Sequence, residues 1–220
     1  DGKGGMAVEK RAGRLDNLAE AVAEAKLDNY VSTTGIGHTR WATHGRPTDI
    51  NAHPHVDIDN KIALVHNGII ENFATLRAEL EDEGVEFRSD TDSETVVHLL
   101  HREYYGDGEN RGNFDESVRA VVNMLDGAFT LVIAHADHPD KLIACRRSTP
   151  LVVGIGEDAM FLGSDVAAFI EYTREAVELG QDNIVTITKD GYSITDFDGN
   201  DVTGRPFTID WDLEAAEKDG

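Results

Sequence analysis

The sequence contains a single cysteine, Cys145, among its 220 residues. One thiol cannot form a disulfide within the chain, so we expect no disulfide framework and a cytoplasmic location, where thiols stay reduced. No apolar run approaches the roughly eighteen residues that a membrane-spanning helix needs. The first five residues, Asp1 to Gly5, lack the basic and apolar parts of a signal peptide. We therefore expect neither a disulfide-rich secreted domain nor a membrane protein.

Basic residues are also scarce: 20 Lys and Arg stand against 42 Asp and Glu, which gives a net charge of −22. A surface this negative repels phosphates and anionic lipids, so we expect neither nucleic acid nor a membrane as a partner. Only seven of the basic residues are lysines. We hypothesise that the source organism keeps high internal salt, which would screen this self-repulsion. An acidic protein of an ordinary organism is the alternative.

The sequence also lacks the motifs of common cofactor sites. No Gly-rich phosphate loop follows a strand, and the histidines show no His-Glu-x-x-His spacing. Five histidines (38, 44, 53, 55 and 66) gather in one region and leave a metal site open as an alternative. The acidic run 89–94 lacks the spacing of an EF-hand calcium loop. We expect no metal and no cofactor.

Hydrophobic periodicity predicts a mixed α and β chain. Helices are expected at 15–25, 72–80, 93–105 and 114–125, with shorter ones at 166–170 and near 174–179. Strands are expected at 6–11, 61–66, 128–135, 141–145, 151–154, 160–163, 183–188 and 192–197. Short turns such as Asp190-Gly191 join most strands, so antiparallel pairing should dominate. This order favours an α+β fold with helices covering sheet faces, over a doubly wound parallel sheet.

The densest polar segment is 37–45, which reads Gly-His-Thr-Arg-Trp-Ala-Thr-His-Gly. Arg40 could clamp a carboxylate through two parallel hydrogen bonds. Trp41 could shield a pocket, and Thr43 and His44 could donate or accept hydrogen bonds. The alternative is a packed Trp41 beside surface polar residues, but so many polar groups with little periodicity are typical of a site loop.

Two further segments carry polar groups at the ends of expected elements. Asn67-Gly68 follows a buried strand, and a side-chain amide beside a glycine N–H could stabilise an oxyanion. A simple Asn-Gly turn is the alternative, and this segment alone favours it. In the run 89–94, Thr91 or Asp92 could cap the following helix, or Asp92 could face the ammonium group of a substrate.

Taken together, these segments resemble the glutaminase domain of the glucosamine-6-phosphate synthases, which are class II glutamine amidotransferases. The resemblance rests on the string 37–45, on Asn-Ala-His-Pro-His at 51–55, on His-Asn-Gly-Ile-Ile-Glu-Asn at 66–72 and on Ser-x-Thr-Asp-x-Glu at 89–94. It extends through Ser-Thr-Pro-Leu at 148–151 and Gly-Ser-Asp at 163–165. Other class II amidotransferases, such as those of the purine pathway, carry a different string in place of Arg-Trp-Ala-Thr-His-Gly.

The resemblance implies an αββα sandwich of two antiparallel sheets, the N-terminal-nucleophile hydrolase fold. It also implies that glutamine is hydrolysed and that a sugar-isomerase domain of the same polypeptide uses the ammonia to convert fructose 6-phosphate, the full-length protein being a homodimer. Asn67 and Gly68 would form the oxyanion hole. The implied substrate-binding residues are Arg40 for the α-carboxylate, Asp92 for the α-ammonium, Thr43 and His44 along the pocket, and Trp41 as its cover and ammonia gate.

The sequence departs from the family at its start. The family nucleophile is an N-terminal cysteine whose own α-amine is the base, whereas this sequence begins at Asp1. We therefore expect an N-terminally truncated glutaminase domain over 1–207, inactive as it stands, and a linker over 208–220. Cys145 lies in an expected strand, and we interpret it as a structural residue. A non-catalytic amino-acid-binding domain and another class II amidotransferase remain as alternatives.

Overall fold

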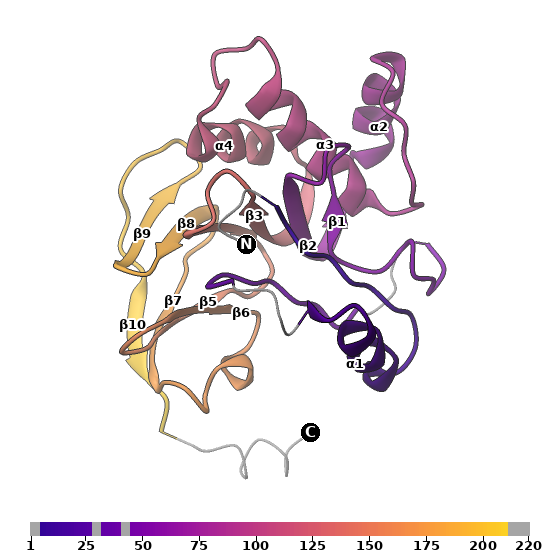
Figure 1. Ribbon diagram of the computed structural model, residues 1–220. Coiled ribbons are helices and arrows are strands. Elements are labelled where there is room, and N and C mark those ends of the chain that lie inside the picture. The colour runs from indigo at the N-terminus through magenta and orange to yellow at the C-terminus, as the bar shows by residue number, and fades with distance from the viewer. Residues whose placement is uncertain (1–4, 28–31, 41–44, 211–220) are drawn as a thin grey trace.

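The computed structural model describes residues 5–27, 32–40 and 45–210, and its strands form two stacked sheets (Figure 1). The larger sheet has the order β1 (His55–Val56), β2 (Ile62–Ile70), β3 (Gly127–His135), β4 (Lys141–Arg147), β8 (Asn183–Thr188) and β9 (Gly191–Asp196). The smaller sheet has the order β10 (Arg205–Thr208), β7 (Glu175–Glu178), β5 (Val152–Ile155) and β6 (Met160–Gly163). Every pair of neighbouring strands is antiparallel, which confirms the expected α+β class with antiparallel sheets.

Three helices cover the outer face of the larger sheet: α2 (Phe73–Asp82), α3 (Asp92–Tyr105) and α4 (Phe114–Met124) (Figure 1). Their apolar faces pack with β2 and β3 in the largest hydrophobic cluster, which includes Leu99, Val118 and Phe129. The expected helix at 15–25 is present as α1 (Leu15–Glu24), and η2 (Val166–Ala168) is a single 3₁₀ turn. Among the described residues, no helix is long and apolar enough to cross a membrane.

The larger sheet is buried on both faces, and β4 shows this most clearly. Ile143 and Cys145 belong to the cluster under the helices, whereas Ala144 between them belongs to the cluster between the two sheets. Because side chains alternate along a strand, both kinds of position must be apolar when both faces are covered. This explains why the sequence of β4 is continuously apolar in its middle.

Two expected elements are wrong. The helix expected near 174–179 is strand β7, which pairs with β5 on one side and β10 on the other. Residues 5–11 have no regular secondary structure, so the strand expected at 6–11 is wrong. Strand β10 extends to Thr208, and the next residue, Ile209, is buried at 3% exposure. The domain boundary at 207 stays a prediction.

Candidate functional site

Strand β2 carries two of the predicted site residues, Asn67 and Gly68, inside the strand rather than in a turn after it. Gly68 pairs with Phe129 on β3 and has a φ of +120°. A Cβ at this position would lie 2.0 Å from the carbonyl oxygen of Ala128. Only glycine therefore allows β3 to pass this close, and the turn interpretation of Asn-Gly is wrong.

His38 fixes the orientation of the Asn67 side chain. The Nε2 atom of His38 lies 2.7 Å from Oδ1 of Asn67. Burial lowers the pKa of the His38 imidazole below its usual 6.5, so the ring is neutral at neutral pH and donates to Oδ1 through its Nε2–H. With Oδ1 held in this way, the Nδ2 amide group of Asn67 remains as a hydrogen-bond donor.

Asp92 is the first residue of α3, and its carboxylate reaches back to β2. Its Oδ2 atom accepts a hydrogen bond of 2.9 Å from the backbone N–H of Ile70. Thr91 occupies the N-cap position but makes no capping hydrogen bond through its side chain. Asp92 is therefore not the helix cap, and it ties the start of α3 to the end of β2 while only 3% exposed.

Ser93 joins two histidines, His53 and His66, to this corner. Its hydroxyl lies 2.8 Å from Nδ1 of His66 and 3.2 Å from Nε2 of His53. Burial lowers the pKa of His53 well below 6.5, and it lowers the pKa of His55 to about 3. These rings are neutral hydrogen-bonding groups that support the site. Among the described residues, the His, Cys, Asp and Glu side chains that lie close enough together to hold a metal ion are Asp57, Asp59 and His101. This group contains none of the histidines at 38, 53, 55 and 66.

Arg40 lies in the segment before the residues that the structure does not describe. Its guanidinium donates to the carbonyl oxygens of Gly45 and Arg46, at 3.1 Å each. A guanidinium carries five N–H groups in a planar fork, so it can hold these carbonyls and also face a carboxylate. The other predicted pocket residues, Trp41, Thr43 and His44, lie outside the described residues.

One cavity of about 150 Å³ brings the four described site residues together. Arg40, Asn67, Gly68 and Asp92 all line it, and they come from a loop, a strand and a helix start that lie far apart in sequence. A second cavity of about 470 Å³ shares His38 and Asn67 with it and reaches Leu162 of the smaller sheet. The site therefore opens toward the space between the two sheets.

Cys145 takes no part in this cavity. The residue is fully buried under the helices, and burial raises the pKa of its thiol to about 12. A thiol with such a pKa carries almost no thiolate at neutral pH, and the thiolate is the nucleophile. The structural interpretation of Cys145 agrees with this geometry.

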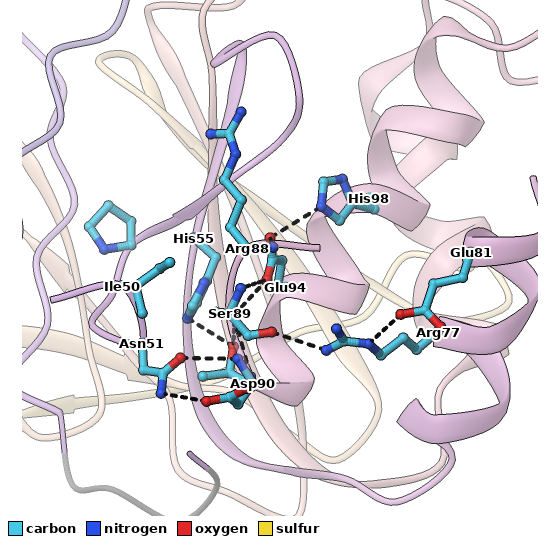
Figure 2. A network of polar contacts seen from close by, with 12 residues as sticks. Ile50, Asn51, His55, Arg77, Glu81, Arg88, Ser89, Asp90, Glu94 and His98 are labelled. Carbon is cyan, nitrogen blue, oxygen red and sulfur yellow. Dashed lines mark hydrogen bonds and ion pairs between the residues drawn. The ribbon is translucent and has the colours of Figure 1, made fainter. Parts of the chain in front are cut away.

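Sequence reasoning missed three residues that build the site from behind: Asn51, Ser93 and Glu94. Glu94 accepts hydrogen bonds from the backbone N–H groups of Arg88 and Ser89, at 2.8 and 2.6 Å, and so shapes the loop before Asp92 (Figure 2). All three residues lie in the motifs at 51–55 and 89–94, so their position was visible in the sequence. The roles of Asn51 and Ser93 were not, because they depend on contacts between segments about 40 residues apart. The contacts of Glu94 are with Arg88 and Ser89, six and five residues away.

Comparison with known proteins gives concordant matches. The model of a family described as "Glutamine amidotransferase domain" matches residues 38–171. The chain is 64% identical over 222 aligned residues to a glutamine–fructose-6-phosphate aminotransferase (isomerizing) of Mycobacterium bovis, covering 99% of this chain and 35% of that protein. It is 62% identical to the protein of the same name in Mycolicibacterium paratuberculosis, covering 100% of this chain and 36% of that protein. The chain thus spans about a third of the length of these curated relatives.

A solved structure shares the fold. It is the glutamine phosphoribosylpyrophosphate amidotransferase from B. subtilis, with a TM-score of 0.61 and 25% sequence identity. The match covers 74% of this chain and 35% of that one. Together with the two antiparallel sheets and their helices, this likeness confirms the expected N-terminal-nucleophile hydrolase-like sandwich.

Proposed function

Because this chain belongs to the glutamine amidotransferase domain family, we propose that it binds L-glutamine in the cavity that Arg40, Asn67, Gly68 and Asp92 line. The single observation that carries this proposal is the shared cavity. It puts a guanidinium, a carboxylate and an oriented side-chain amide around one space of about 150 Å³. An α-amino acid with an amide side chain offers a complementary group to each of them.

The two charged residues would hold the α-groups of glutamine. Arg40 would bind the α-carboxylate through parallel hydrogen bonds, and Asp92 would bind the α-ammonium. Oδ1 of Asp92 lies 3.4 Å from the Ser93 hydroxyl, and Oδ2 accepts a hydrogen bond from the backbone N–H of Ile70. Trp41, Thr43 and His44 stay predicted pocket residues.

Asn67 and Gly68 would stabilise the transition state of amide hydrolysis. When a nucleophile adds to the side-chain amide carbon of glutamine, the carbonyl oxygen becomes an oxyanion. The Nδ2 group of Asn67, turned by His38, and the backbone N–H of Gly68 would donate to it. The family resemblance assigns the attacking thiol to an N-terminal cysteine, which stays a prediction. Cys145 cannot take this role, because it is buried and its pKa is about 12.

We further propose that the ammonia serves the conversion of fructose 6-phosphate to glucosamine 6-phosphate in a longer polypeptide that includes a sugar-isomerase domain and forms a homodimer. The support is the 64% identity to a relative named glutamine–fructose-6-phosphate aminotransferase, against 25% to the B. subtilis amidotransferase. The gene sequence on both sides of this chain tests it. A sugar-isomerase domain downstream is expected, and a phosphoribosyltransferase-like domain there would contradict it. The cytoplasmic location also stays a prediction.

Calorimetric titration of this chain with L-glutamine tests the site. We expect one binding event, weakened about tenfold or more by Arg40→Ala and by Asp92→Asn. Asparagine at 92 can still accept the Ile70 N–H, so the change removes the charge and keeps the local fold. Arg205→Ala is the matched control, since Arg205 is exposed on β10 and pairs with Glu178. The site assignment is wrong if the chain does not bind glutamine or if both variants bind as the wild type does.

A further inference from the structure

Asn51 joins Arg46, whose carbonyl holds Arg40, to Asp90 in the loop before Asp92. Its side chain is buried at 1% exposure, although it lies in a largely exposed loop. Its Nδ2 group donates to the carbonyl oxygen of Arg46 at 3.1 Å and to Oδ2 of Asp90 at 3.3 Å. Its Oδ1 atom accepts from the backbone N–H of Asp90 at 3.0 Å. Figure 2 shows Asn51 and Asp90 facing each other across these bonds.

On one side of this contact, Asn51 supports the carbonyl groups that hold Arg40. The oxygen of Arg46 accepts from both the Arg40 guanidinium and the Asn51 amide. Gly45, whose carbonyl is the second acceptor for Arg40, packs directly on Asn51: a Cβ at Gly45 would lie 2.8 Å from Nδ2 of Asn51. The position of the Arg40 guanidinium therefore follows the position of the Asn51 side chain.

On the other side, Asn51 bonds to a loop that is anchored by other hydrogen bonds. Ser89 donates its backbone N–H and its hydroxyl to Oε2 of Glu94, at 2.6 Å each. The guanidinium of Arg77 donates to the carbonyl oxygen of Ser89 at 3.0 Å (Figure 2). Asp90 follows this anchored residue and precedes Asp92 by two positions. The loop before Asp92 is thus anchored to the helices. Through its bonds to Asp90 and Arg46, Asn51 fixes the position of Arg40 relative to that loop.

We propose that Asn51 is a positioning residue that sets the spacing between the Arg40 guanidinium and the Asp92 carboxylate, and thereby makes the cavity selective for free α-amino acids. This inference rests on the proposed function of the same site. A ligand that carries both an α-carboxylate and an α-ammonium gains from holding both ends at once, and this gain is lost when the two protein groups are wrongly spaced. A ligand with one of the two groups does not depend on the spacing.

The experiment compares ligands that use one or both ends. L-Glutamine carries both charged α-groups, glutaramate lacks the α-ammonium, and L-glutamine α-amide lacks the α-carboxylate. We expect Asn51→Ala to weaken L-glutamine by about tenfold or more, measured by calorimetry, and to change the affinities for the two one-ended ligands by less than about twofold. A general loss of structure would weaken all three ligands together.

Two further variants keep the test decisive. Asp90 is exposed, and Asp90→Ala removes one acceptor of the Asn51 Nδ2 group while the bonds of Asn51 to the Arg46 carbonyl and to the Asp90 backbone N–H remain. We expect the same selective loss for L-glutamine. Asp90→Asn keeps an acceptor for the Nδ2 group and should restore affinity. Asn183→Ala is the matched control, because Asn183 is a buried asparagine bonded to the carbonyl of Gln181 in the larger sheet and does not line the cavity.

The outcomes separate this inference from the proposed function. Equal weakening of all three ligands by Asn51→Ala and Asp90→Ala, or no weakening of any, overturns the positioning role of Asn51 while leaving glutamine binding by the wild type intact. Failure of the wild-type chain to bind L-glutamine overturns the proposed function instead.

Discussion

Replacement of Glu94 by glutamine should cost the protein about 3 kcal/mol at neutral pH and almost nothing in strong acid. Burial alone would raise the pKa of Glu94, but the His98 imidazole, whose Nε2 lies 3.5 Å from Oε1, and hydrogen bonds from the Ser89 hydroxyl and the backbone N–H groups of Arg88 and Ser89 outweigh it and lower the pKa from 4.5 to about 2. At about 1.4 kcal/mol per pKa unit, the fall of about 2.5 units corresponds to about 3 kcal/mol. This value agrees with the cost of about 1–3 kcal/mol for leaving buried donors such as the Ser89 N–H unpaired.

The sign follows from the direction of this pKa change. A carboxylate whose pKa is lowered by folding stabilises the folded state at pH values above its unfolded pKa of 4.5. As the pH falls from 4.5 toward 2, the folded protein must take up the proton against these hydrogen bonds, and the stabilisation is lost. The wild type should therefore lose its advantage over Glu94→Gln within this pH range.

Urea unfolding of both proteins at a series of pH values from 7 to 2.5 measures the difference in free energy of unfolding. Other titrating groups are common to both proteins, so they cancel in the difference. Glu116→Gln is the matched control, since Glu116 forms a partly exposed pair with Arg119 and should contribute less than about 1 kcal/mol. A difference for Glu94→Gln that stays constant with pH, or that is no larger than the control, would refute the reasoning.

Three further predictions concern other features of the fold. Gly68→Ala should destabilise the protein by about 3 kcal/mol or more, because its Cβ would lie 2.0 Å from the Ala128 carbonyl oxygen at a φ of +120°; an unchanged melting temperature would contradict this. The Cys145 thiol should resist an aromatic disulfide reagent in the native protein and react in urea, and rapid native labelling would contradict its burial. The melting temperature should rise with KCl toward molar concentrations, because salt screens the net charge of −22; indifference to salt would remove the hypothesis of a high-salt source.

The sequence was a good guide to elements whose periodicity agrees with their tertiary contacts. The helices α2, α3 and α4 begin and end within two residues of expectation, because their apolar faces are also their buried faces. β7 was mistaken for a helix because its four residues are too few to show a period, and its pairing with β5 and β10 decides its structure.

The same contrast holds at the candidate site. Arg40, Asn67, Gly68 and Asp92 were predicted from residue type and from the family resemblance, and they line one cavity. The strand that carries Asn67 was expected to stop before it, since Asn-Gly is a strong turn signal. Nine residue pairs with β3, from Ile62–His135 to Ile70–Gly127, carry the strand through this signal. Such pairing joins residues far apart in the chain, and local sequence patterns do not reveal it.

The continuous pairing of β2 with β3 determines how readily each part of the site opens by thermal motion. Asn67 and Gly68 lie within the longest ladder of the described residues, so their backbone should exchange hydrogen with solvent only when much of the larger sheet opens. Arg40 lies in a segment without regular structure and can leave and return by local fluctuation alone. We therefore expect a ligand to enter past Arg40, where local opening is fast. Asn67 and Gly68, which would face the amide of the ligand, should open only as slowly as the larger sheet does.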